Sequence, residues 1–335
     1  MKNMKKLLSV ILASAIALSM TACSGGSGSE ESAAPEASSE AYKIGVVQLV
    51  EHPALDQAYT GFVDGLKEAG LEEGKDFVID YQNAQGEQAN CQTIASKLVN
   101  DQNDLIYAIA TPAAQAVAAT TETIPVLVSA VTDPADAKLV KSNEAPGTNI
   151  SGTSDLTPVK EQMELLTQLL PEAKTVAMLY CSSESNSKFQ VEIAKAAAAE
   201  LGLETIEATV SSSAEIQQVV EALVGKVDAI YAPTDNMIAA GMPTVSMVAT
   251  AAGIPIIAGE RGMVENGGLA TYGINYYELG KLTGAMAVEI LKNGANPAEM
   301  PVQYLTNCDL TINKAIAETL NVTIPEDLAA KAEMV

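Results

Sequence analysis

Short runs of β-branched and apolar residues alternate, from Tyr42 onward, with segments whose apolar residues recur at helical spacing. Residues 44–47 form the first predicted strand, and apolar residues then recur every three or four positions from Ala54 to Leu66, the spacing of an amphipathic helix. A second strand is predicted at residues 77–81. Strands that alternate with helices in this way are typical of an α/β doubly wound parallel sheet.

The alternating pattern occurs twice. Residues 104–108 read Asp-Leu-Ile-Tyr-Ala and residues 228–232 read Asp-Ala-Ile-Tyr-Ala. In both copies an Ile-Pro pair then opens another apolar run, at residues 124–128 and at residues 254–258. The matches indicate an internal duplication, so we predict two similar lobes.

The segments upstream of these matches also correspond. In each copy a predicted helix ends at a glycine, Gly70 or Gly202, the residue favoured just past a helix C-terminus. A strand and a helix follow in both copies, at residues 77–81 and 93–99 in the first and at residues 204–208 and 216–224 in the second.

A further amphipathic helix, at residues 276–291, lies beyond the second copy. In the two-lobe binding fold such a helix packs back on the first lobe, so the chain crosses the hinge three times, which restricts the lobes to opening and closing. We expect the crossings near residues 151–156, 271–275 and 305–310. The predicted boundaries are 42–153 plus 275–306 for lobe 1, and 154–274 plus 307–335 for lobe 2.

The first 41 residues have a different character. Three lysines precede an apolar run at residues 7–20, and Cys23 follows small residues, so residues 1–22 are predicted to be a lipoprotein export signal. The sequence before Cys23 is similar to a lipobox, although Met20 stands where leucine is usual, and Cys23 is then the lipidated residue. Residues 23–41 are rich in Ser, Gly, Glu and Ala, which predicts a disordered tether. The protein is expected outside the cytoplasm, anchored to the bacterial cell membrane.

Composition excludes several classes of function. The formal net charge of −23 argues against nucleic acid or anionic lipid as a partner. Besides Cys23, the odd and widely spaced set Cys91, Cys181 and Cys308 allows one disulfide and requires none, and it does not resemble a metal site. His52 is the single histidine, and no nucleophile elbow, dinucleotide fingerprint or P-loop is present. We therefore expect no catalysis, no cofactor and no metal.

Ligands of open α/β sheets bind at the carboxyl ends of the strands, so the residues just after each strand are the candidates for a binding site. In lobe 1 these candidates are Gln48, Glu51 and His52, then Thr111, Pro112, Ala113, Ala114 and Gln115, and then Ser129, Thr132 and Asp133. Thr111-Pro112 and Asp133-Pro134 each predict a helix N-cap followed by proline at the first helical position. The N-terminus predicted at Thr111 would suit a ligand carboxylate, although plain helix capping would give the same pattern.

In lobe 2 the corresponding candidates are Ser183, Glu184, Asn186, Ser187, Thr234, Asp235, Asn236 and Glu260. Asp235 takes the place in lobe 2 that Thr111 takes in lobe 1. An acidic residue opposite a carboxylate site would pair with an ammonium group, and the combination predicts an α-amino acid as ligand. Glu51, His52 and Glu260 are alternative contacts for the ammonium group or the ligand side chain, or else solvated loop residues.

These segments together resemble the ABC-transporter substrate-binding family whose characterised members bind tryptophan, tyrosine or phenylalanine. The resemblance rests on Gly45–Gln48 with His52–Asp56, Ala110–Ala116, Val131–Pro134, Ser183–Ser187 and Thr234–Asn236. It implies a periplasmic-binding-protein-like fold of type I and ligand contacts at these loops. It also implies an ABC permease as partner, and we expect a monomer.

The resemblance does not fix the ligand. The chain has no Trp and three Phe to stack on an aromatic ring. Tyr180, Tyr231 or Tyr272 would supply such a surface, unless they are buried strand residues. We expect a hydrophobic amino acid, and an aromatic one before an aliphatic one.

Three other classes of protein share this architecture. A cofactor-independent amino-acid racemase needs one thiol on each lobe; Cys181 follows a strand of lobe 2, but no cysteine stands at the equivalent place near Gln48. A binding module that signals to a membrane receptor would have the same folded chemistry as an import protein. A sugar-responsive repressor is excluded by the export signal and by the missing helix-turn-helix.

Overall fold

The structure is a computed structural model, and it describes residues 41–335. The predicted export signal, Cys23 and all but the last residue of the predicted tether lie outside the described residues. Between residues 41 and 335, no helix has the length and apolar character needed to cross a membrane.

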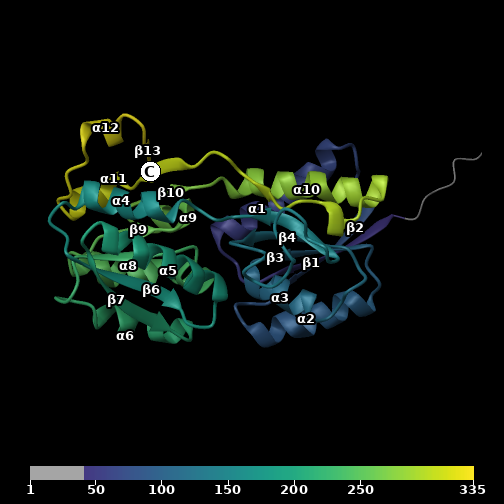
Figure 1. Cartoon of the computed structure of the whole chain (residues 1–335), viewed down its shortest axis with the longest axis horizontal. Helices are drawn as coiled ribbons and strands as arrows, with labels where there is room; N and C mark the ends of the chain where they lie inside the picture. Colours follow the sequence, from purple (N-terminus) through teal and green to yellow (C-terminus); the bar gives the residue numbers. More distant parts are fainter. Residues whose placement is uncertain (1–40) are drawn as a thin grey trace, which may run out of the picture. The chain divides into compact units, whose positions relative to one another are not determined.

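Lobe 1 is built on a parallel six-stranded sheet in the order β11-β5-β4-β3-β1-β2. Its strands are β1 (Tyr42–Gln48), β2 (Phe77–Asn83), β3 (Leu105–Ile109), β4 (Val126–Val131), β5 (Ile150–Ser154) and β11 (Gln303–Tyr304). Helices α1 (Pro53–Glu68) and α10 (Tyr276–Asn293) cover one face, and α2 (Gln88–Asn100) and α3 (Thr111–Ala118) cover the other (Figure 1). The short 3₁₀ helix η2 (Pro297–Glu299) precedes β11.

Lobe 2 repeats this plan in a seven-stranded sheet ordered β13-β12-β10-β9-β8-β6-β7. Its strands are β6 (Thr175–Cys181), β7 (Glu204–Val210), β8 (Ala229–Ala232), β9 (Ile256–Ala258), β10 (Ala270–Gly273), β12 (Asp309–Ile312) and β13 (Glu333–Met334). Its helices are α4 (Val159–Leu169), α5 (Ser185–Glu200), η1 (Ser213–Glu215), α6 (Ile216–Glu221), α7 (Asn236–Ala240), α8 (Met242–Ala251), α9 (Arg261–Glu265), α11 (Lys314–Thr319) and α12 (Glu326–Ala329). Among the paired strands of the described chain, only the pair β10–β12 is antiparallel, so β12 and its parallel neighbour β13 run opposite to the rest of the sheet.

The duplication inferred from the sequence is visible in the strand order. The first strand of each lobe, β1 or β6, lies between the second and third, and the fourth strand follows outward as β4 or β9. Tyr107 and Tyr231, the matching tyrosines of the two copies, are both fully buried on the third strand of their sheet. Their hydroxyls find different partners, Ala58 O at 3.3 Å and Gln162 Oε1 at 2.8 Å.

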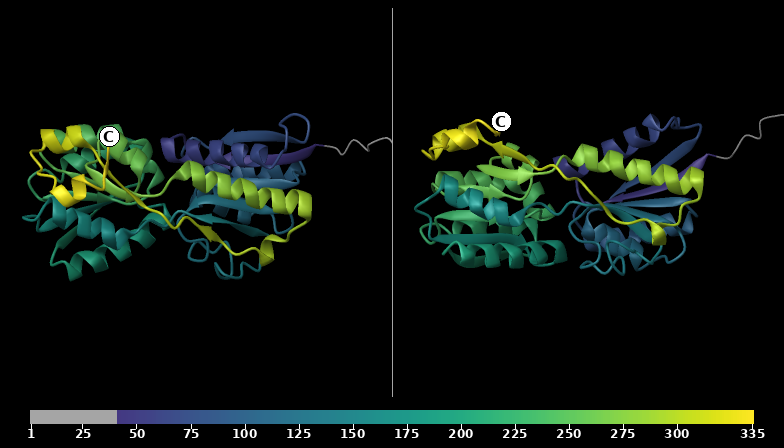
Figure 2. Two further views of the ribbon diagram at one scale, coloured as in Figure 1. Left: turned by 90° about the horizontal axis from the view of Figure 1, so that it is seen from above. Right: turned by 45° about the horizontal axis from the view of Figure 1, so that its top comes forward.

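The chain passes between the lobes three times, after β5, between β10 and α10, and between β11 and β12 (Figures 1 and 2). The middle crossing delivers α10 to lobe 1, where it packs along α1 (Figure 2). Glycines make this close approach: a Cβ at Gly61 would lie 2.0 Å from Tyr277 O, and one at Gly280 would lie 2.1 Å from Ala58 O. A side chain at either position would push the two helices apart.

The structure corrects two local predictions of helix starts. Helix α3 starts at Thr111 with Ala110 as its N-cap, so Thr111 is not the capping residue and Pro112 is not the first helical residue. The segment after Asp133 is a turn and not a helix. The Asp133 carboxylate still accepts the backbone N–H groups of Ala135 and Asp136, both at 2.9 Å, and Ala137 N–H donates to Asp133 O at 2.9 Å, but this single helical bond is not continued into a helix.

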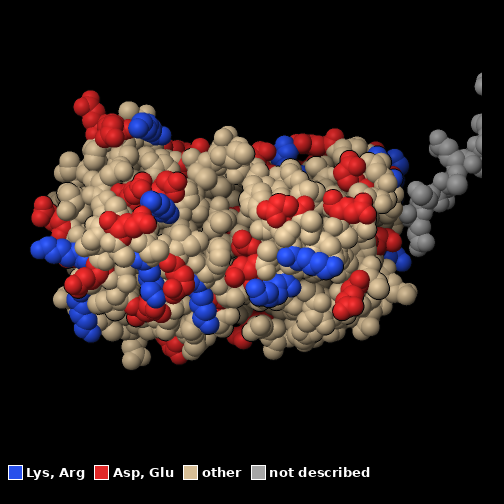
Figure 3. Space-filling model, in the orientation of Figure 1, with Lys and Arg blue, Asp and Glu red and all other residues tan. Residues whose placement is uncertain are grey.

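Charged side chains of both signs are interspersed over the face drawn in Figure 3. Several lysines bind carboxylates: Lys195, for example, contacts Glu192 at 3.0 Å and Glu207 at 2.9 Å. Exposed ion pairs of this kind contribute little to stability, but they place each of these lysines next to negative charge, so the lysines do not gather into a basic surface.

Candidate functional site

The carboxyl ends of the two sheets face each other, and side chains from their loops meet across a cleft. The imidazole Nε2 of His52 in lobe 1 lies 3.4 Å from Asn236 Oδ1 in lobe 2. Gln115 Nε2 donates to Ser185 Oγ at 3.3 Å, and the Thr132 and Thr234 hydroxyls lie 3.5 Å apart. The loops that the strand-end rule selected therefore lie on opposite walls of one cleft.

Two spaces open in this cleft, and each is lined from both lobes. We call the first the inner cavity; it is lined by His52, Leu55, Ala130, Asp155, Thr234, Asp235, Asn236, Ala239, Glu260 and Tyr276. We call the second the outer cavity; its lining includes Leu49, Val50, Pro112, Ser183, Glu184, Asn236, Met237 and Ala240. Asn236 lines both, so the two cavities are neighbours.

Several predicted residues have placements away from these cavities. Glu51 is exposed and lines neither of them. Ser129 is fully buried and accepts a hydrogen bond from Thr153 at 3.0 Å. The Asp133 carboxylate accepts the backbone N–H of Ala135 in the turn that follows it. Gln48 donates to Val50 O and to Asp56 Oδ1, and its Oε1 is buried without a partner. Ala113 and Ala114 are buried in the first turn of α3.

The start of α3 has unusual backbone geometry. Ala110 has a φ of 82° and Ala130, on the neighbouring strand end, has a φ of 54°. Non-glycine residues in this region cost roughly 1–3 kcal/mol each, and such strain is typical of binding sites. The Thr111 hydroxyl is buried without a partner, and the first-turn N–H groups of a helix have no acceptor within it. This helix start therefore offers unmatched donors to an anion.

On the lobe 2 wall, Asp235 is bound by its own protein on both carboxylate oxygens. Its Oδ1 accepts Ile238 N–H at 2.9 Å and so caps α7, and its Oδ2 accepts Cys181 N–H and the Ser187 hydroxyl, both at 2.6 Å. The residue is completely buried, and burial raises the pKa of its carboxyl above the usual range.

Glu184 has a similar structural role. Its carboxylate accepts the backbone N–H groups of Asn236 at 3.2 Å and Met237 at 3.1 Å, together with the side-chain amides of Asn186 and Asn236. Burial, and then the nearby Asp235 carboxylate, raise the pKa of Glu184. The two acids hold the loops of the lobe 2 wall in place.

The end of the cleft nearest the hinge contains two residues that the sequence analysis did not select. Asp155 follows β5 at the first crossing, and Tyr276 begins α10 at the second. The Tyr276 hydroxyl donates to Asp155 Oδ2 at 2.6 Å, while Asp155 Oδ1 is buried without a partner. Burial raises the pKa of Asp155 to about 6. The available signal was an acidic residue inside the predicted hinge crossing, a segment that had been considered only as a connection.

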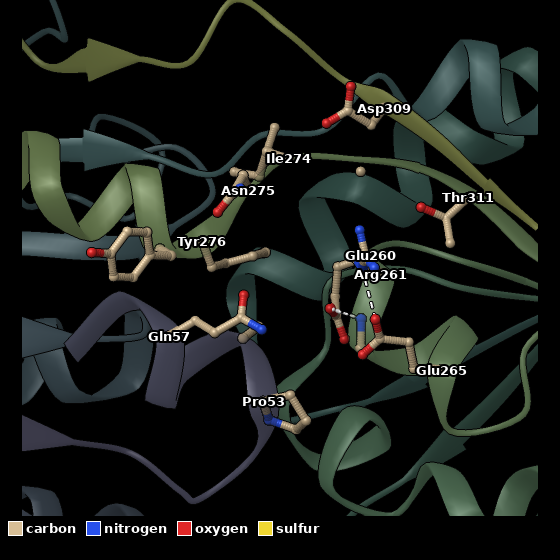
Figure 4. A pocket seen from close by; sticks show the side chains of 14 residues that line it. Pro53, Gln57, Glu260, Arg261, Glu265, Ile274, Asn275, Tyr276, Asp309 and Thr311 are labelled. Atoms are coloured by element: carbon tan, nitrogen blue, oxygen red, sulfur yellow. Dashed lines mark hydrogen bonds and ion pairs between the residues drawn. The ribbon is translucent and has the colours of Figure 1, made fainter. Parts of the chain in front are cut away.

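Glu260 lies beside this pair. It caps α9 by accepting the N–H groups of Gly262 and Met263, the latter at 2.8 Å, and burial raises its pKa to about 7. Glu260 and Tyr276 also line a separate pocket at the hinge, with Arg261 and Asp309 (Figure 4). Arg261 is directed to other carboxylates there, those of Glu265 and Glu333.

His52 is a neutral group at this site. Burial lowers the pKa of its imidazole to about 4, and its Nδ1 has no partner. It can therefore donate or accept one hydrogen bond to a ligand without bringing a charge into the cleft. Among the described residues, no group of His, Cys, Asp and Glu has an arrangement that could hold a metal ion.

Two parallel-sheet lobes, three crossings between them and a cleft lined from both define a bilobal solute-binding protein, periplasmic-binding-protein-like and of type I. The chain belongs to the ABC transporter substrate-binding protein family, whose model matches residues 43–335.

Its relatives include proteins of known ligand. It is 44% identical over 321 residues to a tyrosine-binding protein of Clostridioides difficile, covering 95% of this chain and 93% of that protein. It is also 44% identical to the crystal structure of an ABC domain from Streptococcus pneumoniae in complex with L-Trp, with a TM-score of 0.86 and coverage of 88% of this chain and 100% of that one.

A third relative is known in its ligand-free, open form. The ligand-free, open structure of a substrate-binding protein with adhesive properties from Clostridium difficile is 47% identical, covers 88% of this chain and 99% of that chain, and has a TM-score of 0.67. The fold of this chain is thus nearer to that of the L-Trp complex than to that of the open protein, at similar sequence identity.

Proposed function

We propose that this chain is the binding lipoprotein of an ABC importer and that it binds an aromatic L-amino acid, without chemical change, between its two lobes. Membership of the substrate-binding family and the likeness to the tyrosine-binding and L-Trp-bound relatives support this ligand class. Cys23 would carry the lipid, and an ABC permease would receive the ligand.

The observation that carries the proposal is the set of unmatched polar groups in the cleft. At one place, beside the outer cavity that Pro112 lines, the start of α3 leaves the buried Thr111 hydroxyl without a partner, although Thr111 itself lines neither cavity. At another, buried carboxylates line the inner cavity, whose lining includes neither Lys nor Arg. A zwitterionic amino acid matches both places, because its carboxylate can bind the start of α3 and its ammonium group can bind a buried acid.

The outer cavity supplies a surface for a large apolar side chain. Leu49 and Val50 come from lobe 1, and Met237 and Ala240 come from lobe 2. The Met237 thioether is suited to contact with an aromatic ring. None of Tyr180, Tyr231 and Tyr272 lines either cavity, so we propose that methionine and aliphatic groups, and not a stacked tyrosine, contact the ring, while the rest of the lining is polar.

Titration calorimetry with the twenty amino acids, and with dipeptides and common sugars as comparison, tests the proposal. We expect L-tryptophan, L-tyrosine or L-phenylalanine to bind most tightly and to be recovered with unchanged optical purity. Binding of a sugar in preference to every amino acid would contradict the ligand class. Racemisation of the recovered ligand would contradict a purely binding role.

A further inference from the structure

Four buried carboxylates lie around the cleft, namely those of Asp155, Glu184, Asp235 and Glu260, each at most 4% exposed. No lysine or arginine lines the inner cavity, to which three of them contribute. Ionised carboxylates without a cation are costly to bury. The arrangement therefore suits a positive group that arrives with the ligand.

Hydrogen bonds within the protein distinguish the four acids. Asp235 and Glu184 each accept a backbone N–H group on both of their oxygens and side-chain donors on one of them. Glu260 accepts one backbone N–H group on each oxygen. These three carboxylates already cap helices or bind the N–H groups of loops. A ligand that took over one of them would leave those N–H groups without an acceptor.

Asp155 differs from the other three. Its Oδ2 accepts the Tyr276 hydroxyl at 2.6 Å, and its Oδ1, although buried, has no hydrogen-bond partner. Both residues line the inner cavity. The Tyr276 hydroxyl therefore holds one carboxylate oxygen of Asp155 and leaves the other without a partner.

We propose that Asp155 Oδ1 accepts the ammonium group of the bound amino acid, with Tyr276 as the positioning residue and Glu260 as a second nearby negative charge. This assignment rests on the proposed function and replaces Asp235, which the sequence favoured for the ammonium group. Because Asp155 follows β5 and Tyr276 begins α10, the contact places the ligand against two of the three hinge crossings.

The variant Asp155→Asn tests the assignment, because it keeps the shape of the side chain and removes the charge. Calorimetry with L-tryptophan and L-tyrosine should show affinity about ten- to hundredfold below that of the unchanged protein, the loss expected for one charge-assisted hydrogen bond. The deaminated analogues, indole-3-propionate and 3-(4-hydroxyphenyl)propionate, lack the ammonium group. Their weaker binding should change less than threefold between the two proteins.

Asp309→Asn is the matched control. Asp309 is an exposed acid of the hinge pocket, and it lines neither the inner nor the outer cavity (Figure 4). Its replacement removes the same charge near the hinge and should leave affinity unchanged. Asp155→Ser keeps an oxygen for the Tyr276 hydroxyl, and it provides the same test if Asp155→Asn does not fold by circular dichroism.

The outcomes separate the assignment from the proposed function. If the unchanged protein binds L-tryptophan or L-tyrosine and both Asp155 variants bind them equally well, the assignment is wrong and the function stands. Equal losses for the amino acids and their deaminated analogues would also overturn it, because they would reveal a general structural defect. If the unchanged protein binds no amino acid, the proposed function fails, and the assignment fails with it.

Discussion

The hydroxyls of Thr132 and Thr234 lie 3.5 Å apart across the cleft, one from each lobe. Gln190, buried in α5 of lobe 2, donates from Nε2 to Thr132 Oγ1 at 3.2 Å and to Thr234 Oγ1 at 2.7 Å. The amide of Gln190 thus links the two walls in the closed arrangement. Because Thr234 belongs to the same lobe as Gln190, only the bond from Gln190 to Thr132 joins the lobes, and it can form only while they are together.

Replacing Gln190 should therefore favour the open protein. We expect Gln190→Ala to lower affinity for the amino acid about two- to tenfold, because closure loses one hydrogen bond between the lobes, worth about 1 kcal/mol. Small-angle scattering should show a smaller radius of gyration on saturation for the unchanged protein, and a smaller decrease for the variant. Gln217→Ala, on the exposed surface of α6, is the control. A profile that does not change on saturation of the unchanged protein would contradict closure.

Affinity should depend on pH through Asp155. Its pKa of about 6 in the closed arrangement means that the carboxyl takes up a proton below that pH and no longer pairs with an ammonium group. The other titratable groups facing the inner cavity are Glu260, Asp235, Tyr276 and His52, and the imidazole stays neutral above pH 5 because its pKa is about 4. Because Glu260 has a pKa of about 7, we expect nearly constant affinity only above about pH 8 and a loss of up to tenfold per pH unit below about pH 6.

Calorimetry between pH 5 and pH 8 measures this dependence. Asp155→Asn should bind weakly at every pH and show a flatter profile. An equally steep profile in the variant would assign the titration to another group.

The ligand-free protein should become less stable as pH rises. The pKa values of Asp155 and Glu260 are raised by burial to about 6 and about 7, so the fold favours their protonated forms. The stability that they contribute is full below the unfolded-state pKa values and is lost as pH rises through the folded values. With two to three pKa units per group, the change is on the order of a few kcal/mol.

Thermal unfolding followed by fluorescence should therefore give a melting temperature that falls between pH 5 and pH 8. Saturating amino acid should reduce the fall, because the ammonium group compensates the ionised Asp155. A melting temperature that rises over this range would show that the buried acids do not control it.

The contact between α1 and α10 should tolerate no side chain at its glycines. A Cβ at Gly61 or Gly280 would overlap backbone oxygen, at 2.0 or 2.1 Å, so Gly61→Ala or Gly280→Ala should lower the free energy of unfolding by about 2–4 kcal/mol through overpacking. Urea unfolding measures the change. Thr60→Ala, at an exposed position of the same helix, should change it by less than about 1 kcal/mol. Equal effects at positions 60 and 61 would mean that the helices can move apart freely.

Anchoring depends, in our proposal, on one residue. Cys23→Ala should release the protein from the cell surface, because Cys23 alone would carry the lipid. Fractionation of intact cells measures the release, and Cys308→Ala is the matched control. Soluble, unanchored wild-type protein in the same assay would contradict the lipoprotein prediction.

Much of the fold could be predicted from the sequence, because duplication repeats the same strand and helix signals. The pattern at residues 104–108 and 228–232 recurs because both segments are buried strands with apolar neighbours on each side. The site was harder to predict. The strand-end rule selects Asp235 and misses Asp155, and it does not show that the protein itself already binds both oxygens of Asp235 and leaves Asp155 Oδ1 without a partner. Thr111 was predicted as a cap, but the positive φ of Ala110 moves the start of α3 by one residue.

The return of α10 to lobe 1 separates the order of synthesis from the order of folding. The ribosome makes the strands β1 to β5 first, but the helix that packs on α1 through Gly280 is completed only at Asn293, after the whole of β6 to β10. Until then one side of α1, with the buried residues Ala58 and Phe62, has no partner helix. A nascent chain of this protein cannot finish its first lobe before most of its second has been made. It therefore remains incompletely folded for most of its synthesis, and an unfolded chain is the form in which a polypeptide can be threaded through a narrow channel.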